Sequence, residues 1–263
     1  MPEPIVAPAY LVVDTESVPD GKLLKLVKYP DDEISTEEAI SLAQQEALER
    51  SGSDFLPVSM QYPVAVCVAR VGADFRLHSV TCLDAPQFRP RQIVEDFWRG
   101  VALYQGARLV TFNGRCFDMP LLELAAFRYG VSAADYFRTS RHRYAGHLDL
   151  MDWLTNYGAF RLSGGLNLLS KILGKPGKMS IAGDQVYSLY QAGKLQEIND
   201  YCMADTLDTY FVFLRTRVLT GEISLARETE LVQEARAWIS EKARNVAALA
   251  SYLANWGDWQ PWP

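Results

Sequence analysis

Two carboxylates, Asp14 and Glu16, directly follow a run of apolar residues in the stretch LVVDTESVPD, residues 11–20. Residues two apart in a β-strand point to the same face, so a buried strand here would place both carboxylates side by side at its end. Like charges that close raise each other's pKa unless a positive charge lies between them. The stretch is therefore either an ordinary surface terminus of a strand or one half of a cation site.

A second polar cluster follows another short apolar run, in the stretch TFNGRCFDMPLL, residues 111–122. This cluster contains Asn113 and Asp118. Asp118 stands near the expected start of a helix, where an aspartate often does no more than cap the first backbone N–H groups. Taken alone, the stretch favours a helix cap.

A third stretch, NDYCMADTLDTYFVF at residues 199–213, has a helical pattern. Tyr201 and Asp205 are four residues apart and share one face of that helix, which by itself could be a plain surface contact. Asp208, one turn beyond Asp205, is expected on the helix surface.

The three stretches together indicate a functional site more strongly than any one of them does, because open α/β sheets gather functional groups at strand ends and adjoining helices. The three stretches could bring four carboxylates together, those of Asp14, Glu16, Asp118 and Asp205. In a partly dry cleft these four negative charges would repel one another strongly. Two hard divalent cations, Mg²⁺ or Mn²⁺, would neutralise that charge. A pair of such ions about 3.5–4 Å apart is the apparatus for phosphodiester hydrolysis.

The elements that must position these residues follow from the sequence pattern. Strands come first and then alternate with helices, which predicts a mixed-sheet α/β domain. The expected strands are 9–14, a hairpin of 63–71 and 75–82, 107–112, and a further strand before Asp149. The expected helices are 92–103, one beginning at 117–127, 166–173, 195–220 and 224–253. Asp149 itself is expected to have a structural role.

Residues 22–52 form a polar, acidic insertion between the first strand and the hairpin. Its later part, ISTEEAISLAQQEALER, has helix formers behind a Ser/Thr cap with two glutamates in the first turn. We therefore divide the chain into a domain at 1–220, with an insertion at about 22–60, and a helical extension with a Trp/Pro-rich tail at 221–263.

The bulk composition restricts the class of protein. Of 263 residues, 49% are hydrophobic and 22% charged, as in an ordinary globular domain with ample core. The sequence lacks an apolar run of about 18 residues, which argues against a membrane span, and its N-terminus lacks the features of a secretory signal. Four scattered cysteines are expected to be reduced core thiols in a cytoplasmic protein, without a disulfide framework or zinc site.

The charge is unevenly distributed. The net charge is −6, yet residues 136–183 contain seven basic side chains and only two acidic ones. In this window Lys171 and Lys175 flank a Gly/Pro loop, where they could grip a nucleic-acid backbone. A solvated loop region explains the same excess equally well.

The three polar stretches, taken in their order along the chain, match the motifs of a known superfamily. Asp-x-Glu, then Asn-x-x-x-Phe-Asp-x-Pro-x-Leu, then Tyr-x-x-x-Asp resembles the three exonuclease motifs of the DEDD 3′–5′ exonuclease superfamily. The matching residues are Asp14 and Glu16, then Asn113, Phe117 and Asp118, then Tyr201 and Asp205. Tyr201 is typical of the DEDDy branch, because the DEDDh branch has a histidine at the position that Asp200 occupies here.

The resemblance covers roughly residues 9–215. Pro120 after Phe117-Asp118, and Tyr201-Cys202 opening the last motif, look most like the proofreading domains of family B DNA polymerases. The sequence as a whole resembles stand-alone bacterial proteins described as predicted 3′–5′ exonucleases related to that domain. It implies a ribonuclease H-like fold with a mixed five-stranded sheet flanked by helices.

The resemblance also implies roles for individual residues. Asp14, Glu16 and Asp205 would hold the metal that activates the attacking water, and Asp14 with Asp118, directly or through water, would hold a second metal at the leaving oxygen. Tyr201 would orient the water. The residues expected to contact substrate are Thr15, Asn113, Phe117, Lys171 and Lys175, although Phe117 fits a core wedge equally well.

The predicted function is a metal-dependent 3′–5′ exonuclease that uses two Mg²⁺ or Mn²⁺ ions. Its expected partner is a nucleic acid with a free 3′ end, above all single-stranded DNA, from which it releases nucleoside 5′-monophosphates. Two alternatives stay open: a 3′–5′ exoribonuclease, and a catalytically silent nucleic-acid-binding module of the same fold. The complete set of four carboxylates and a tyrosine argues against the silent module.

Overall fold

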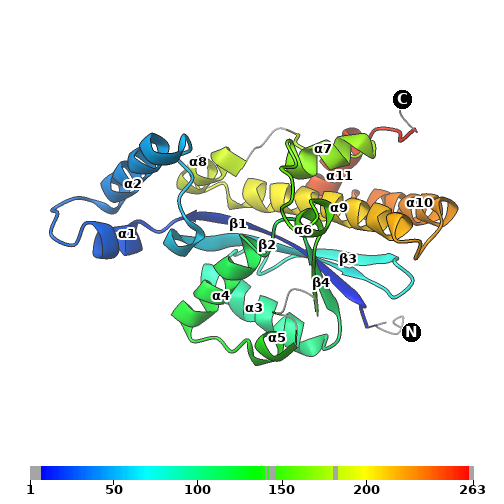
Figure 1. Ribbon diagram of the computed structural model, residues 1–263, viewed down its shortest axis with the longest axis horizontal. Helices are drawn as coiled ribbons and strands as arrows, with labels where there is room; N and C mark the ends of the chain where they lie inside the picture. Colours follow the sequence, from blue (N-terminus) through cyan, green and yellow to red (C-terminus); the bar gives the residue numbers. More distant parts are fainter. Residues whose placement is uncertain (1–6, 140, 142–145, 180–182, 261–263) are drawn as a thin grey trace.

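A five-stranded mixed sheet runs through the middle of the protein in the order β3-β2-β1-β4-β5 (Figure 1). The computed structural model describes residues 7–139, 141, 146–179 and 183–260. β1 pairs antiparallel with β2 and parallel with β4. The strands are β1 (Tyr10–Pro19), β2 (Gln61–Val71), β3 (Leu77–Cys82), β4 (Arg108–Thr111) and β5 (His147–Asp149). The predicted α/β fold is confirmed, and its sheet fits the ribonuclease H-like architecture.

The central strand β1 is longer than the predicted strand at 9–14. It pairs with β2 all the way to Pro19, with a register irregularity between Glu16 and Ser17. Asp14 and Glu16 therefore lie inside a strand, and their predicted position at its end is wrong. The extension depends on the antiparallel partner, because β4 pairs only with residues 10–12 of β1.

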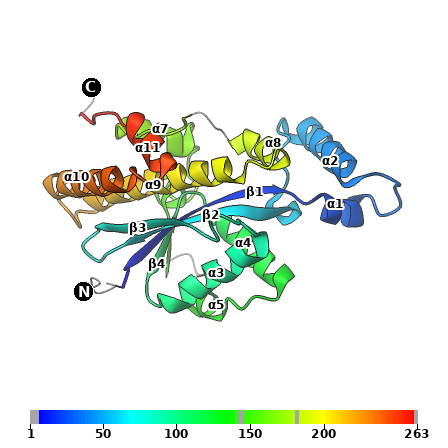
Figure 2. The ribbon, with the colours of Figure 1, turned by 180° about the vertical axis from the view of Figure 1, so that it is seen from behind.

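Helices cover both faces of the sheet (Figures 1 and 2). The long helix α9 (Leu195–Leu219) lies across β1 and β2 on one face, with α7 (Gly165–Ile172) packed on it. On the other face lie α3 (Pro90–Leu103) and α4 (Asp118–Tyr129). Further short helices between β4 and α9 are α5 (Ala134–Thr139), α6 (Leu150–Leu154), η2 (Gly183–Gln185) and α8 (Val186–Gln191). This arrangement brings α9 over the strand that carries Asp14 and Glu16.

The C-terminal extension is two helices, α10 (Leu225–Lys242) and α11 (Ala247–Ala254), where one helix over 224–253 was predicted. Val246 has an extended backbone, with φ −128° and ψ 104°, so the chain turns there and α11 packs back on α10 and α9. Buried residues of both helices, among them Leu231 and Tyr252, belong to the same hydrophobic core as the sheet.

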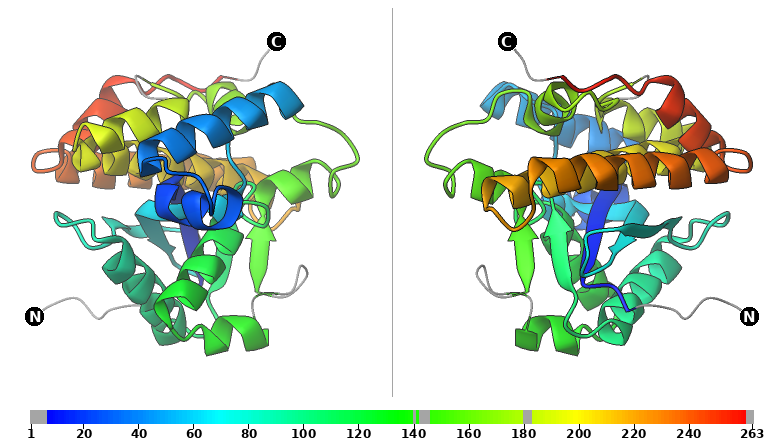
Figure 3. Two further views of the ribbon diagram at one scale, coloured as in Figure 1. Left: turned by 90° about the vertical axis from the view of Figure 1, so that its left-hand side faces the viewer. Right: turned by 90° about the vertical axis from the view of Figure 1, so that its right-hand side faces the viewer.

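The insertion forms a helical pair at one end of the molecule, in blue in Figure 3. The helices are α1 (Gly21–Lys28) and α2 (Thr36–Ser51), followed by the turn η1 (Val58–Met60). The predicted cap of α2 is confirmed, since Ser35 and Glu38 form a reciprocal capping box. α1 was not predicted. The pair has a small core of its own, made by Leu24, Ala39, Ile40, Ala43, Ala47 and Leu56.

The cysteines follow the prediction in part. Cys67, Cys82 and Cys202 are buried free thiols, whereas Cys116 is exposed, which corrects the expectation of four core thiols. Cys116 falls in the turn between β4 and α4, outside the sheet. Over the residues that the structure describes, the chain has no helix long and apolar enough to cross a membrane.

Candidate metal centre

Three carboxylates converge where α9 crosses β1. Asp14, Glu16 and Asp205 each offer an oxygen atom, and these atoms all lie within 4.8 Å of one another. The two β1 residues share a face because they are two apart in a strand. The Cys202 thiol donates to the carbonyl oxygen of Asp14 at 3.3 Å and so ties α9 to this point of the strand. All three residues are partly exposed, although Oδ2 of Asp14 itself is buried.

Asp118 lies beside this cluster without being one of its three members. It is the first residue of α4 and is only 3% exposed. The hydroxyl of Thr15 donates to its Oδ1 at 2.8 Å, so Thr15 uses its side chain inside the protein to orient Asp118. The Thr15 side chain is buried and engaged in this hydrogen bond, and the expected substrate contact of Thr15 stays a prediction.

The carboxylates of the cluster repel one another. Burial, followed by the charges of Glu16 and Asp205, raises the pKa of Asp14 well above its ordinary value. Burial also raises the pKa of Glu16, and it raises the pKa values of Asp118 and Asp205 to about 7. These carboxyls must therefore bind protons near neutral pH or share a positive ion.

The donor set fits a hard divalent cation. Every candidate ligand atom is a carboxylate oxygen, which Mg²⁺, Mn²⁺ and Ca²⁺ prefer. Oδ2 of Asp14 is buried and has no hydrogen-bond partner among the described residues. An unpaired buried carboxylate oxygen is costly, and a bound cation would remove that cost.

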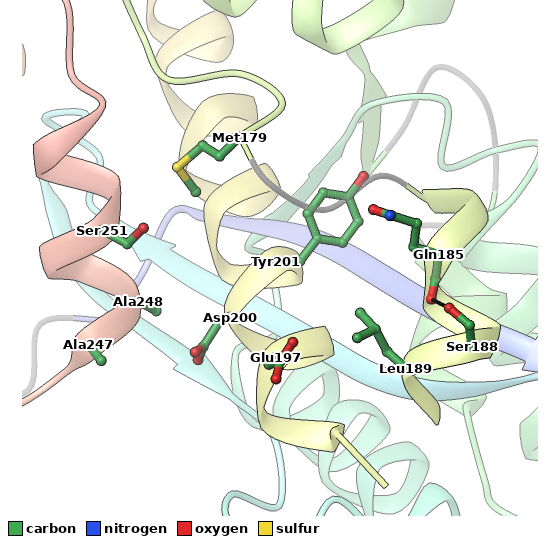
Figure 4. Close-up of a pocket in the computed structure, with 10 residues that line it drawn as sticks. All are labelled: Met179, Gln185, Ser188, Leu189, Glu197, Asp200, Tyr201, Ala247, Ala248 and Ser251. Carbon is green, nitrogen blue, oxygen red and sulfur yellow. Dashed lines mark hydrogen bonds between the residues drawn. The ribbon is translucent and has the colours of Figure 1, made fainter. Parts of the chain in front are cut away.

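Tyr201 lies one helical turn before Asp205. Burial, and then the charges of Asp205, Glu16 and Asp14, raises the pKa of its hydroxyl, which keeps the hydroxyl protonated and able to donate a hydrogen bond. Its ring lines a cavity of about 490 Å³ that also touches α8 and α11. Figure 4 shows the hydroxyl pointing away from the Asp200 carboxylate on the same helix.

The turn after β4 is held by Asp149, whose predicted structural role is confirmed. Its carboxylate accepts from the backbone N–H groups of Asn113 and Arg115, both at 2.9 Å, and it also caps α6. Asn113 has a left-handed backbone, with φ +64°, which asparagine tolerates better than most residues. Asp149 thereby fixes the turn that leads to Asp118.

Gly114 in this turn is expected to tolerate no side chain. A Cβ at Gly114 would overlap the side chain of Thr111 in β4. Gly114→Ala should therefore lower the free energy of unfolding by about 2 kcal/mol, as measured by urea denaturation. The matched control is Gly100→Ala in α3, where an added Cβ would meet no described atom within 4 Å apart from its chain neighbours and its own helix backbone; it should be neutral or slightly stabilising. Equal effects of the two substitutions would contradict the overlap.

The two lysines predicted to grip substrate behave differently. Lys175 is only 5% exposed, and its ammonium lies over the rings of Trp256 and Phe211, at 4.4 and 5.0 Å from their centroids. Burial lowers the pKa of Lys175 to about 8. Its predicted substrate contact is wrong, because the C-terminal tail covers it. Lys171 is exposed and donates to the Pro176 carbonyl oxygen.

Lys178 is the lysine of this loop whose charge reaches the cluster, since it lowers the pKa of Asp205 against the effect of burial. Its side chain is exposed, while its backbone N–H donates to Asn167 Oδ1 at 2.8 Å. The basic excess of the sequence pointed to this loop without distinguishing Lys178 from its neighbours. Arg143, a member of the same basic window, lies outside the described residues.

Asp208 is not the helix-surface residue that was predicted. It is 1% exposed, and the Tyr252 hydroxyl of α11 donates to its Oδ1 at 2.6 Å. Burial raises the pKa of Asp208 to about 6. The prediction failed because α11 covers this face of α9, and the helical pattern of α9 alone carries no sign of that neighbour.

Comparison with known proteins supplies the family. A family described as "Predicted 3'-5' exonuclease related to the exonuclease domain of PolB" matches residues 53–256. The chain is also 23% identical, over 131 residues, to the catalytic subunit of DNA polymerase epsilon from Schizosaccharomyces pombe. That match covers 47% of this chain and only 6% of the polymerase. The family match contains Asp118, Tyr201 and Asp205 but begins after the strand that bears Asp14 and Glu16. The chain belongs to this family of predicted exonucleases related to the exonuclease domain of PolB.

Proposed function

We propose that this protein is a DEDDy-type 3′–5′ exonuclease that removes nucleotides from the 3′ end of single-stranded DNA. The observation that carries the proposal is the convergence of Asp14, Glu16 and Asp205 on one point, with Asp118 beside them. The family match supports nuclease chemistry. DNA is favoured as the substrate because the relative from Schizosaccharomyces pombe is named as part of a DNA polymerase.

Each residue has a role in this proposal. Asp14, Glu16 and Asp205 would hold one divalent ion, and Asp14 and Asp118 would provide ligands for a second. When bound, such ions lower the pKa of water and neutralise charge at the reacting phosphate. Thr15 keeps Asp118 in place, and the protonated Tyr201 hydroxyl donates a hydrogen bond to the attacking water. Asn113, Phe117, Lys171 and Lys178 contact the strand in this proposal, which the exposure of the two lysines permits.

The proposal is tested by incubating the protein with 5′-labelled oligonucleotides of DNA and RNA, each single- and double-stranded. With Mn²⁺ or Mg²⁺ the single-stranded DNA should shorten stepwise from its 3′ end and release nucleoside 5′-monophosphates, and a chelator should stop this. Shortening of RNA alone would replace the proposal by an exoribonuclease. Binding without any shortening would replace it by a silent nucleic-acid-binding module.

Tyr201→Phe is expected to lower kcat by roughly 100-fold, because it removes one hydrogen-bond donor to the reacting water. Binding of the oligonucleotide, measured by fluorescence anisotropy, should change little, since the ring is retained. Equal losses of binding and of kcat would show that Tyr201 has a structural role only.

A further inference from the structure

An exposed aromatic side chain of the insertion lies against a residue of the proposed site. Phe55, in the segment between α2 and η1, is 58% exposed. Its ring centroid lies 5.8 Å from that of Phe117, with the ring planes at 48°. Phe117 directly precedes Asp118. The insertion therefore adds an aromatic face beside the second sequence motif.

The segment that carries Phe55 is anchored to the strand of the metal centre. Its neighbour Leu56 is buried in the core of the insertion. The side-chain amide of Gln61 donates to the Leu56 carbonyl oxygen at 2.6 Å, and its Oε1 accepts from the Ser17 hydroxyl at 2.5 Å. Ser17 directly follows Glu16. Phe55 is thus linked to the residue next to Glu16 on one side and contacts the residue next to Asp118 on the other.

Exposure alone does not explain this placement, since single exposed apolar residues are common. Leu48 in α2 is exposed to a similar extent, at 53%, and serves as a comparison. Phe55 differs in having both a second aromatic ring beside it and a fixed backbone next to it. An anchored pair of partly open aromatic rings is a surface on which a flat nucleobase can stack.

We infer that Phe55 and Phe117 together stack on the unpaired base of the 3′-terminal nucleotide, so that the insertion contributes a specificity-determining residue, Phe55, to the site. This inference rests on the proposed function. Stacking on an aromatic face tolerates any base, because every base has a π-face. The pair would therefore select for an unpaired terminal base, not for a particular sequence.

The inference is tested by binding, separately from hydrolysis. The probes are two 5′-fluorescein-labelled single-stranded DNA oligonucleotides that differ only at the 3′-terminal residue, which in one carries no base. Their affinities are measured by anisotropy in Ca²⁺, with intact probe verified on a gel. The unaltered protein should bind the complete oligonucleotide roughly 10-fold more tightly than the one without the terminal base.

Phe55→Ala should weaken binding of the complete oligonucleotide to the level of the abasic one and leave the abasic one unchanged. Phe55→Trp should keep the preference, and so should the control Leu48→Ala. All three variants should melt within a few degrees of the unaltered protein, because both positions are exposed.

Two results would overturn the inference: full base preference in Phe55→Ala, or an equal loss of affinity for both probes, which would mean that Phe55 only shapes the fold. Failure of the proposed function has a different signature. If the unaltered protein discriminates between the probes but hydrolyses neither in Mn²⁺, the aromatic pair stands and the exonuclease does not.

Discussion

Asp205→Asn should abolish nuclease activity and, at the same time, raise the melting temperature of the metal-free protein. Asparagine keeps the shape of the side chain but removes one of the three carboxyl groups whose oxygens lie within 4.8 Å of one another. The rate should fall by about 1000-fold or more, because the lost ligand supports the metal chemistry. Removal of a repelled, largely buried charge should stabilise the metal-free fold by on the order of 2 kcal/mol.

The measurement is thermal unfolding at pH 8 in a chelator, paired with the oligonucleotide assay in Mn²⁺. Glu197→Gln is the matched control, since it removes one negative charge from the same helix at an ion pair with Lys194 whose side chains are about half exposed. Its effect on stability should lie within about 0.5 kcal/mol, with activity retained. If Asp205→Asn destabilised the metal-free protein, repulsion would not dominate the cluster.

The stability of the metal-free protein should fall as pH rises from about 4 to about 7. Burial raises the pKa values of Asp118 and Asp205 to about 7 in the folded state, against about 3.9 for an unfolded aspartate. Between these values the folded state binds more protons than the unfolded state, so stability is full below about pH 4 and is lost as pH rises through 7. The loss should be on the order of several kcal/mol for the two groups together.

Urea denaturation at closely spaced pH values in a chelator measures this loss. The double variant Asp118→Asn/Asp205→Asn should reduce the slope between pH 5 and 7 and so give the share of these two carboxyls. Asp14, Glu16 and Asp208, whose pKa values burial also raises, should keep a slope of their own. Mn²⁺ should restore the stability of the unaltered protein at pH 8 and have little effect at pH 5, where protons compete for the same oxygens. An unchanged slope in the double variant would show that Asp118 and Asp205 do not cause the pH dependence.

The parts of the site that follow from short periodic patterns could be predicted from the sequence. Asp14 and Glu16 share a face because they are two apart in a strand, and Tyr201 and Asp205 because they are four apart on a helix. The sheet and its flanking helices follow from the same periodicities. These patterns and the family resemblance together led us to expect that all four carboxylates converge; three of them do, and Asp118 lies beside them.

The remaining features depend on partners distant in the sequence. β1 extends past Glu16 only because β2 continues to pair with it, and Thr15 reaches Asp118 across 103 positions. The three lysines between residues 171 and 178 look alike in the sequence. The docking of Trp256 buries Lys175, whereas Lys178 is exposed and its charge lowers the pKa of Asp205. The spacing of residue types along the sequence does not show which distant residues come into contact.

The bond between Tyr252 and Asp208 has a consequence for how this chain can diverge or be recombined. Tyr252 belongs to the last helix, while Asp208 lies one turn from Asp205 on α9. Loss of the phenol alone would leave a buried carboxylate without that donor, so the two positions should covary among homologues. A chimera that exchanges the C-terminal helices must therefore transfer residue 208 together with residue 252. The set of residues that must change together at this site therefore extends beyond the third acidic motif and includes Tyr252 of α11.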